Sequence, residues 1–375
     1  MEQTEQQYAE EINQQRLGEV FHRMVDIYSP SGKEHELVDY LVDYLQTNTE
    51  LPVHTREVSD GRCNIEIYPA GTKPEIAFVG HLDTVGAFDI EEYEYRQEDG
   101  QIFGLGTADM KSGCAAMLEA FISYQESGHS SLPAGLFLVV GEEEAGDGIS
   151  AVLEEHRFTS ALVAEPTDLI PCLIHYGYIE MEIHAFGRRR HASMAGREYN
   201  AIFSMLRMLL RLGGLLEADY PEVVLNIRDL HSSESGFAVP DRCDAAVDLH
   251  VPPTGLTSRL LEEVKALVDN CLLGGAVTSH DVEIPTLSEG YRVDAEERLA
   301  EVLENIYHRR GLSWAPGAFK SQSDANLMSA AGCKPLVLGP GQLGRAHTRD
   351  EAVYFAQVVQ AAGIYLEMLR ELTAP

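Results

Sequence analysis

The chain has 375 residues, of which 45% are hydrophobic, so it is long enough for two domains and apolar enough for packed cores. It carries 28 lysine and arginine residues against 60 aspartate and glutamate residues, which gives a formal net charge of −32. A charge of this sign repels nucleic acids and anionic membrane surfaces, so neither is expected as a partner.

The cysteines and the first residues of the chain indicate the cellular compartment of the protein. The six cysteines are scattered and form no Cys-x-x-Cys pair, which disfavours both a disulfide scaffold and a cysteine-based zinc site. The N-terminal residues are polar and acidic and lack an apolar signal core, and no apolar run is long enough to span a bilayer. We therefore expect a cytoplasmic protein with reduced thiols.

Hydrophobic periodicity predicts an α/β fold for the first part of the chain. Some segments repeat apolar residues at helical spacing, and others alternate or form the short apolar runs that are typical of buried parallel strands. The expected helices cover about 14–28, 37–45 and 114–121, and the expected strands cover 53–58, 64–68, 75–80, 136–140 and 161–164.

The pattern changes near Pro171 and changes back after about residue 285. The expected elements between these points are strand 176–186, helix 201–212, strands 223–230 and 245–251, helix 257–273 and strand 276–284. The order β-α-β-β-α-β predicts a ferredoxin-like α+β domain. An α/β pattern resumes with helices near 295–308 and 352–371 around a strand at 335–338. We therefore expect one domain made of 1–173 and 286–375, with a second domain inserted over 174–285.

Residues that can bind metal ions follow several of the expected strands. They are His81, Asp83, Asp109, Glu142, Glu143, Glu144, Glu165 and His347. Taken singly, His81-Leu82-Asp83 is more often a capped turn, Asp109 is more simply a helix N-cap, and the glutamate triplet can be a solvated acidic loop. In open α/β sheets, however, ligands bind beyond the carboxyl ends of the strands, so together the residues predict a metal site. Histidine with several carboxylates suits zinc or a similar divalent ion, and the surplus of carboxylates indicates two ions that share one of them.

Five motifs, in this order, resemble the co-catalytic zinc metallopeptidase family, which includes acetylornithine deacetylase, succinyl-diaminopimelate desuccinylase, aminoacylase and glutamate carboxypeptidase. The motifs are His81-Leu82-Asp83-Thr84-Val85, Gly106-Thr107-Ala108-Asp109-Met110-Lys111, Glu142-Glu143-Glu144, Glu165-Pro166-Thr167 and His347-Thr348-Arg349-Asp350-Glu351. The resemblance extends over nearly the whole chain. It implies a zinc-peptidase-like α/β catalytic domain and an inserted dimerisation, or lid, domain, and hence a homodimer.

The resemblance also implies a set of metal ligands. His81, Asp109 and Glu165 would bind one ion, and Asp109, Glu144 and His347 would bind the other, so that Asp109 bridges the two. Zinc is the expected metal, with cobalt or manganese as alternatives. The family often has a cis peptide after the bridging aspartate, so the Asp109–Met110 bond is expected to be cis.

Three further residues receive roles from the resemblance. Asp83 would orient the imidazole of His81. Glu143 would be the general base, which takes a proton from the attacking water and returns it to the leaving amine. His191, in the motif Gly187-Arg188-Arg189-Arg190-His191-Ala192, would reach the partner subunit's active site and stabilise the oxyanion.

The register of the glutamate triplet leaves two assignments open. The family usually has Asp-Glu-Glu here, with the base second and the ligand third, and the spacing to Gly146 favours Glu143 as base and Glu144 as ligand. In the shifted alternative, Glu142 is the base and Glu143 is the ligand.

The implied activity is metal-dependent hydrolysis of amide bonds in N-acyl amino acids or small peptides. A di- or tripeptidase or a carboxypeptidase of the same fold is one alternative, and a non-catalytic protein that binds metal or amino acids is another. The chain has Asp248-Leu249-His250 where many relatives have Asp-x-Arg. The acyl group and the amino-acid side chain of the substrate therefore stay open.

Overall fold

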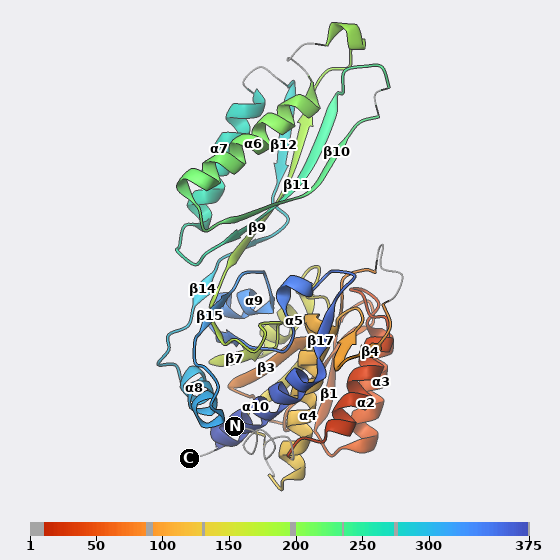
Figure 1. Cartoon of the computed structure of the whole chain (residues 1–375), viewed down its shortest axis with the longest axis vertical. Coiled ribbons are helices and arrows are strands. Elements are labelled where there is room, and N and C mark those ends of the chain that lie inside the picture. The colour runs from red at the N-terminus through yellow and green to blue at the C-terminus, as the bar shows by residue number, and fades with distance from the viewer. Residues whose placement is uncertain are drawn as a thin grey trace. The chain divides into compact units, whose positions relative to one another are not determined.

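The computed structural model describes residues 11–87, 93–129, 132–195, 200–234, 236–273 and 277–373 (Figure 1). The chain divides into two compact units. The larger consists of Met1–Leu173, Val293–Phe319 and Ser323–Pro375, and the smaller consists of Ile174–Arg292 and Lys320–Gln322. Within the described residues, no helix is both long and apolar enough to cross a bilayer. All six cysteines lie in the described part and are free thiols.

The main sheet of the larger unit has a parallel centre with antiparallel strands on both sides. Its order is β1 (Val53–Ser59), β2 (Arg62–Ile67), β6 (Gly135–Val139), β3 (Ile76–His81), β7 (Ser160–Val163), β16 (Lys334–Val337) and β8 (Cys172–His175), and β15 (Gly317–Phe319) pairs with β8. The neighbours β6, β3, β7 and β16 run parallel. Their carboxyl ends therefore lie along one edge of the sheet.

Both faces of this sheet are buried, which explains the unbroken apolar runs in the sequence. On one face, the ring of Phe78 in β3 lies 5.5 Å from Phe121 and 6.2 Å from Tyr365, measured between centroids. Phe137 of β6 is in register with Val79, so it points to the opposite face, where its ring lies 5.1 Å from Phe158.

Helices pack around the sheet of the larger unit. They are α2 (Gln14–Asp26), α3 (His35–Asn48), α4 (Ser112–Glu126), α5 (Asp147–Glu155), α8 (Arg298–Arg310), α9 (Asp324–Ala330) and α10 (Phe355–Thr373). The α4 helix contacts α10 and α2, and α10 also contacts α8. The sequence pattern did not predict α5 or α9, because each offers too few turns for a helical period to emerge.

A small separate sheet with the order β17-β5-β4 also belongs to the larger unit. It consists of β4 (Arg96–Glu98), β5 (Gln101–Phe103) and β17 (Ala352–Tyr354). These strands are too short to show alternation, so the sequence pattern predicted none of them and indicated a final helix from residue 352 instead. The β17–β5 pairing matters for function because it brings the segment after His347 next to the segment before Asp109.

The smaller unit confirms the predicted ferredoxin-like order. It contains β9 (Gly177–Phe186), α6 (Ala201–Asp219), β10 (Val224–Ser232), β11 (Arg242–Val251), α7 (Thr257–Leu273) and β12 (Ser279–Glu283). The strands form an antiparallel sheet in the order β10-β11-β9-β12. The first residue of the last predicted strand, Ala276, lies outside the described residues.

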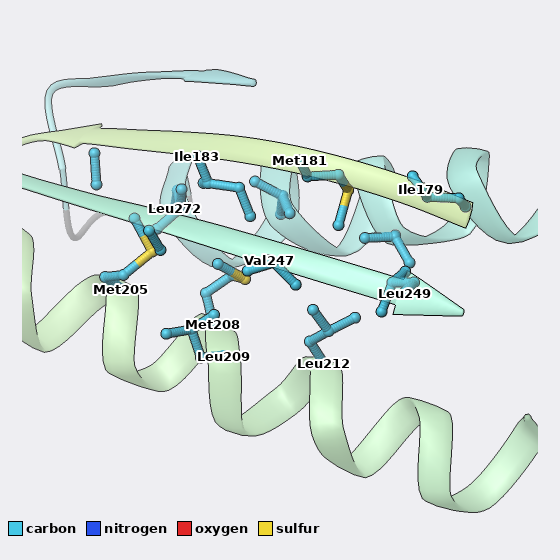
Figure 2. Packing of buried hydrophobic residues seen from close by; sticks show 14 of the residues in the cluster. Ile179, Met181, Ile183, Met205, Met208, Leu209, Leu212, Val247, Leu249 and Leu272 are labelled. Carbon is cyan, nitrogen blue, oxygen red and sulfur yellow. The ribbon is translucent and has the colours of Figure 1, made fainter. Parts of the chain in front are cut away.

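The core of the smaller unit forms between one face of this sheet and its two helices (Figure 2). Alternate residues of β9 are buried, which produces the strict alternation in the sequence. Met181 and Ile183 of β9 and Val247 of β11 pack with Met208 and Leu212 of α6, and all five are fully buried. This unit therefore has a hydrophobic core of its own.

The smaller unit continues to Arg292 rather than ending at residue 285. The reason is strand pairing. The short strand β13 (Leu287–Ser288) pairs with β9, and β14 (Tyr291–Arg292) pairs with Ile174 and His175 of β8. Two-residue strands leave no periodic signal in the sequence.

Candidate metal centre

The predicted site residues of the larger unit come together beyond the carboxyl ends of the parallel strands. His81 is the last residue of β3 and is in register with Val139 of β6. Glu142 and Glu143 follow β6, and Glu165 follows β7 by two residues. Asp109 arrives from an irregular helical turn that leads into α4, and the Asp109–Met110 peptide is cis, as the resemblance implied.

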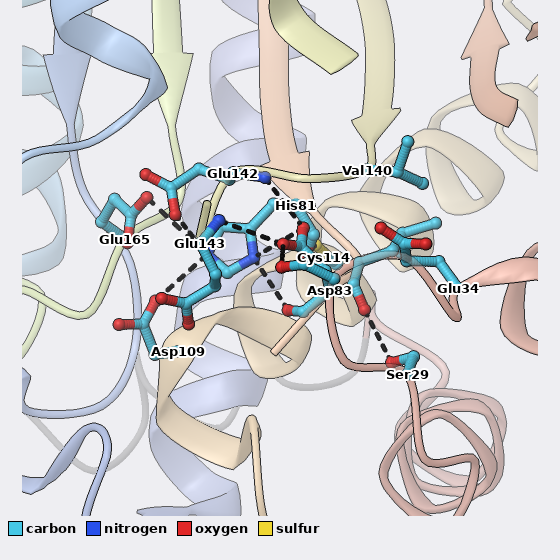
Figure 3. Close-up of polar contacts among 12 residues, drawn as sticks. Ser29, Glu34, His81, Asp83, Asp109, Cys114, Val140, Glu142, Glu143 and Glu165 are labelled. Atoms are coloured by element: carbon cyan, nitrogen blue, oxygen red, sulfur yellow. Dashed lines mark hydrogen bonds and ion pairs between the residues drawn. The ribbon is translucent and has the colours of Figure 1, made fainter. Parts of the chain in front are cut away.

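The first group of possible ligands consists of His81, Asp109 and Glu165 (Figure 3). Nε2 of His81 lies 3.2 Å from Oδ1 of Asp109 and 3.9 Å from Oε1 of Glu165. Nδ1 of His81 donates to the backbone carbonyl of Asp83 at 3.0 Å. Because Nδ1 carries the proton in this bond, the lone pair of Nε2 faces the two carboxylates, which is the form that binds a metal.

The second group consists of Asp109, Glu143 and His347, and Asp109 belongs to both groups. Nε2 of His347 lies 3.0 Å from Oε1 of Glu143 and 3.5 Å from Oδ2 of Asp109. In each group the ligand atoms lie within 4.8 Å of one another. The two oxygens of Asp109 thus point to two different histidines, which is the arrangement of a bridging carboxylate.

In the structure, the glutamate triplet is placed differently from the register preferred on sequence grounds. Glu144 is exposed and belongs to neither group, whereas Glu143, which we expected to be the base, stands at the ligand position beside His347. Glu142 takes the remaining position, with Oε2 3.8 Å from Nε2 of His81, and it is a member of neither ligand group. These positions match the shifted alternative, in which Glu143 is a possible ligand and Glu142 lies beside the ligands.

The local backbone explains this register. The carboxylate of Asp83, which is fully buried, accepts the backbone N–H of Glu142 at 3.2 Å and that of Glu143 at 3.0 Å. Gly141 precedes them with a φ of 76°, and a side chain there would collide with Asp147 and Arg62. The turn is thus held with Glu142 directed toward His81, Glu143 toward His347 and Glu144 toward solvent.

In the structure, Asp83 contacts the His81 ring chiefly through its backbone. Its backbone carbonyl, rather than its carboxylate, accepts the closer hydrogen bond from the His81 ring, since the carboxylate oxygen lies 3.6 Å from Nδ1. The carboxylate instead holds the Glu142–Glu143 turn and accepts a hydrogen bond from Oγ of Ser31 at 2.7 Å. One residue thereby orients a ligand of the first group and the loop of the second.

The buried carboxylates at this edge of the sheet would be stabilised by bound cations. Burial raises the pKa of Glu142 and Glu165 well above the usual range, and the neighbouring carboxylates add to the effect. Oε1 of Glu165 is buried and has no hydrogen-bond partner among the described residues. A divalent cation would use that oxygen and offset the repulsion, and the histidine and carboxylate donors suit zinc or a similar ion.

Glu351 also supports this centre, although the sequence motif that contains it indicated no role for this residue. It is 3% exposed, and its carboxylate accepts the backbone N–H groups of Gly106 at 3.0 Å, Ala108 at 2.8 Å and Asp109 at 3.1 Å. One side chain thus ties the loop of the bridging aspartate to the chain segment after His347. A lone glutamate four residues after a histidine carries no signal for such a contact.

Replacing Glu351 by alanine is expected to lower the free energy of unfolding by about 3 kcal/mol, because it leaves three buried N–H groups without a partner. The measurement is denaturant unfolding of the metal-free protein. Asp350→Asn is the matched control, since Asp350 is exposed and should change little. Equal stability of the two variants would show that Glu351 does not anchor the loop.

His191 lies in the smaller unit, is exposed and belongs to neither ligand group. Its Nδ1 accepts the backbone N–H of Ser193 at 3.2 Å and lies 2.8 Å from Oγ of the same residue. In the neutral ring the proton therefore resides on Nε2, which leaves that nitrogen as a donor. This tautomer is the one that an oxyanion-binding histidine needs.

Known proteins share both the sequence pattern and the fold. A probable carboxypeptidase of Aspergillus terreus is 26% identical over 93% of this chain and 85% of its own length, and an acetylornithine deacetylase of Salmonella paratyphi B is 26% identical over 78% of this chain and 82% of its own. The crystal structure of a tripeptidase from Staphylococcus aureus has the same fold, with a TM-score of 0.81, 20% identity, and coverage of 96% of this chain and 99% of that one.

A family model described as "Peptidase family M20/M25/M40" matches residues 77–371 of this chain. The match spans the segments that deliver both ligand groups, from His81 to His347. The chain therefore belongs to peptidase family M20/M25/M40 and is a hydrolase that acts on amide bonds.

Proposed function

We propose that the chain hydrolyses the amide bond of N-acyl amino acids or small peptides, using two divalent metal ions, most simply zinc. The observation that carries the proposal is the placement of Asp109, whose two carboxylate oxygens face different histidines at 3.2 and 3.5 Å. The ligands would be His81, Asp109 and Glu165 for one ion, and Asp109, Glu143 and His347 for the other. Cobalt or manganese would suit the same donors.

The side chains around the ligands supply the remaining chemistry. Ions bound here would acidify water and polarise the carbonyl of the scissile amide. Glu142 holds a carboxylate oxygen 3.8 Å from Nε2 of His81 without being a ligand. From that position it takes the proton of the attacking water and returns it to the leaving nitrogen. Asp83 keeps Glu142 in place through the hydrogen bond to its backbone N–H.

A second candidate is a di- or tripeptidase or a carboxypeptidase with the same centre. It is favoured by the probable carboxypeptidase that aligns with 93% of this chain, whereas the acetylornithine deacetylase aligns with 78%. Both candidates use the same metal ligands and the same base. They differ in what lies on either side of the scissile amide.

One assay tests the proposal and separates the candidates. Purified protein is incubated with N-acetyl amino acids, dipeptides and tripeptides, before and after removal of metal with a chelator and after readdition of zinc. We expect hydrolysis that the chelator abolishes and zinc restores, with N-acetyl amino acids cleaved fastest. Faster cleavage of peptides would favour the second candidate. Two bound metals per chain without hydrolysis of any compound would overturn both and indicate a non-catalytic binder.

We also propose a homodimer that forms through the smaller unit. Among the described residues, the edge strand β10 pairs on one side only, and it exposes Val224, Ile227 and Leu230, at 41–45%. The neighbouring helix α6 exposes Phe203, Leu206 and Leu210, the last at 78%. An unpaired strand edge beside apolar side chains favours association with a second copy.

In such a dimer, His191 would serve the partner subunit's active site, and mixing variants tests this. His191→Ala and Glu142→Gln should each lower kcat by ~10² or more. Co-refolded in equal amounts, they should recover about a quarter of the wild-type activity, because half of the dimers are mixed and each has one complete site. Dimers by light scattering that recover no activity would exclude the shared site, and a monomer would exclude the dimer.

A further inference from the structure

Beside the metal centre, the larger unit has a pocket of about 240 Å³ whose apolar walls come from Pro166, Ile170, Cys172, Phe319 and Leu343. We propose that this pocket binds one uncharged, apolar side chain of the substrate next to the scissile amide. This proposal rests on the proposed function and specifies which substrates the protein would prefer.

The position of the pocket follows from the order of the strands. His81 ends β3, Glu165 follows the neighbouring β7, and the next strand, β16, leads into Gly339–Gln342. Pro166 and Thr167, which directly follow Glu165, line the pocket from one side, and Gln342 lines it from the other. The pocket thus continues the line of metal-binding residues by one strand, along the edge where α/β sheets bind their ligands.

Two close contacts connect the pocket walls to the metal ligands. A side chain at Gly339 would come within 2.5 Å of the backbone oxygen of Glu165, so these two loops touch. Gly341 has a φ of 88° and packs against Ala108, the residue before Asp109. A group in the pocket therefore lies against the loops that carry a ligand of the first group and the bridging aspartate.

The size of the pocket suits one side chain rather than a whole substrate. Sites that enclose drug-sized ligands have volumes of ~300–1,000 Å³, so a volume of about 240 Å³ is below that range. The rest of the substrate would then lie outside the pocket, as it must if the amide is to reach the ligand groups.

The polar groups of the pocket are already engaged with the protein. The carboxylate of Asp168 accepts hydrogen bonds from the side-chain amides of Gln342 at 3.2 Å and Gln357 at 2.6 Å. Oγ1 of Thr167 donates to the carbonyl of Gly339 at 3.3 Å. Among the described residues, no lysine, arginine or histidine lines the pocket. An acidic substrate side chain would have no cation to pair with in the pocket and would be repelled by the carboxylate of Asp168. An apolar side chain needs no such partner.

Side-chain preference tests the inference. N-acetyl amino acids and dipeptides are compared with glycine, leucine, glutamate or lysine on each side of the scissile bond. On one side of that bond, we expect kcat/KM for leucine to exceed the values for the other three by ~10-fold or more. Ile170→Ala should reduce this preference, and Ile170→Lys should shift it toward glutamate. Ile170 is 47% exposed, so both variants should fold. Leu273→Ala, an exposed aliphatic position in the smaller unit, is the matched control.

A binding measurement keeps the inference testable without turnover. Calorimetry with the Glu142→Gln protein should show tighter binding of N-acetyl-leucine than of N-acetyl-glycine by ~10-fold, and Ile170→Ala in that background should reduce the difference. Equal affinities, or a leucine preference that ignores Ile170, would overturn the pocket assignment. A preference for lysine would overturn it as well. Lack of hydrolysis of every compound by the wild-type protein would instead overturn the proposed function.

Discussion

Replacing Glu142 by glutamine is expected to lower kcat by ~10² or more while both metal ions stay bound. The physical reason is its place beside the ligand groups. Oε2 of Glu142 lies 3.8 Å from Nε2 of His81, yet neither ligand group includes this residue. Glutamine has nearly the same shape but cannot accept the proton of the attacking water. Metal content by elemental analysis and steady-state kinetics on the same sample provide the measurement.

The neighbouring glutamates provide the controls for this experiment. Glu143→Gln should lose metal, since Oε1 of Glu143 lies 3.0 Å from Nε2 of His347 within the second group. Glu144→Gln should change neither activity nor metal content, because Glu144 is exposed and lies outside both groups. An active Glu142→Gln protein together with a metal-loaded but inactive Glu143→Gln protein would restore the register that the sequence first favoured.

Replacing Asp109 by alanine is expected to remove both metal ions, whereas replacing His347 should remove one. Asp109 alone contributes to both ligand groups, with Oδ1 toward His81 and Oδ2 toward His347. Its loss leaves each group with two of its three protein ligands. His347→Ala leaves the group of His81, Asp109 and Glu165 complete.

Metal titration of the stripped proteins by calorimetry distinguishes these outcomes. The wild type should bind two equivalents, His347→Ala one, and Asp109→Ala none at the wild-type affinity. Hydrolysis should fall by several orders of magnitude in Asp109→Ala, since without the ions the reaction loses both its activated water and its polarised carbonyl. An Asp109→Ala protein that still binds one equivalent tightly would show that the two groups do not share this carboxylate.

The sequence could indicate a site at the strand ends because this argument depends only on local patterns. His81 and Glu165 directly follow short apolar runs that are typical of buried parallel strands, and the carboxyl ends of such strands lie at one edge of the sheet. Asp109 and His347 lie in less regular segments, so the strand pattern marked them only loosely, and the resemblance to a family gave them their roles as ligands. The structure brings all four into the two ligand groups.

The glutamate triplet could not be assigned in the same way. Glu142, Glu143 and Glu144 lie on a turn, where neighbouring side chains point in directions that no periodicity fixes. Their directions depend on the carboxylate of Asp83, about sixty residues earlier in the chain. Glu351 was missed for the same reason, since its partners are backbone N–H groups more than 200 residues away. Contacts of this kind exist only once the fold is formed.

Diffraction from crystals of the zinc-loaded protein, recorded at the zinc absorption edge, tests the central claim most directly. We expect two anomalous peaks, one among His81, Asp109 and Glu165 and one among Asp109, Glu143 and His347, separated by ~3.5–4 Å, with Asp109 bound to both. A single peak, or a second ion held by Glu144 in place of Glu143, would contradict the account.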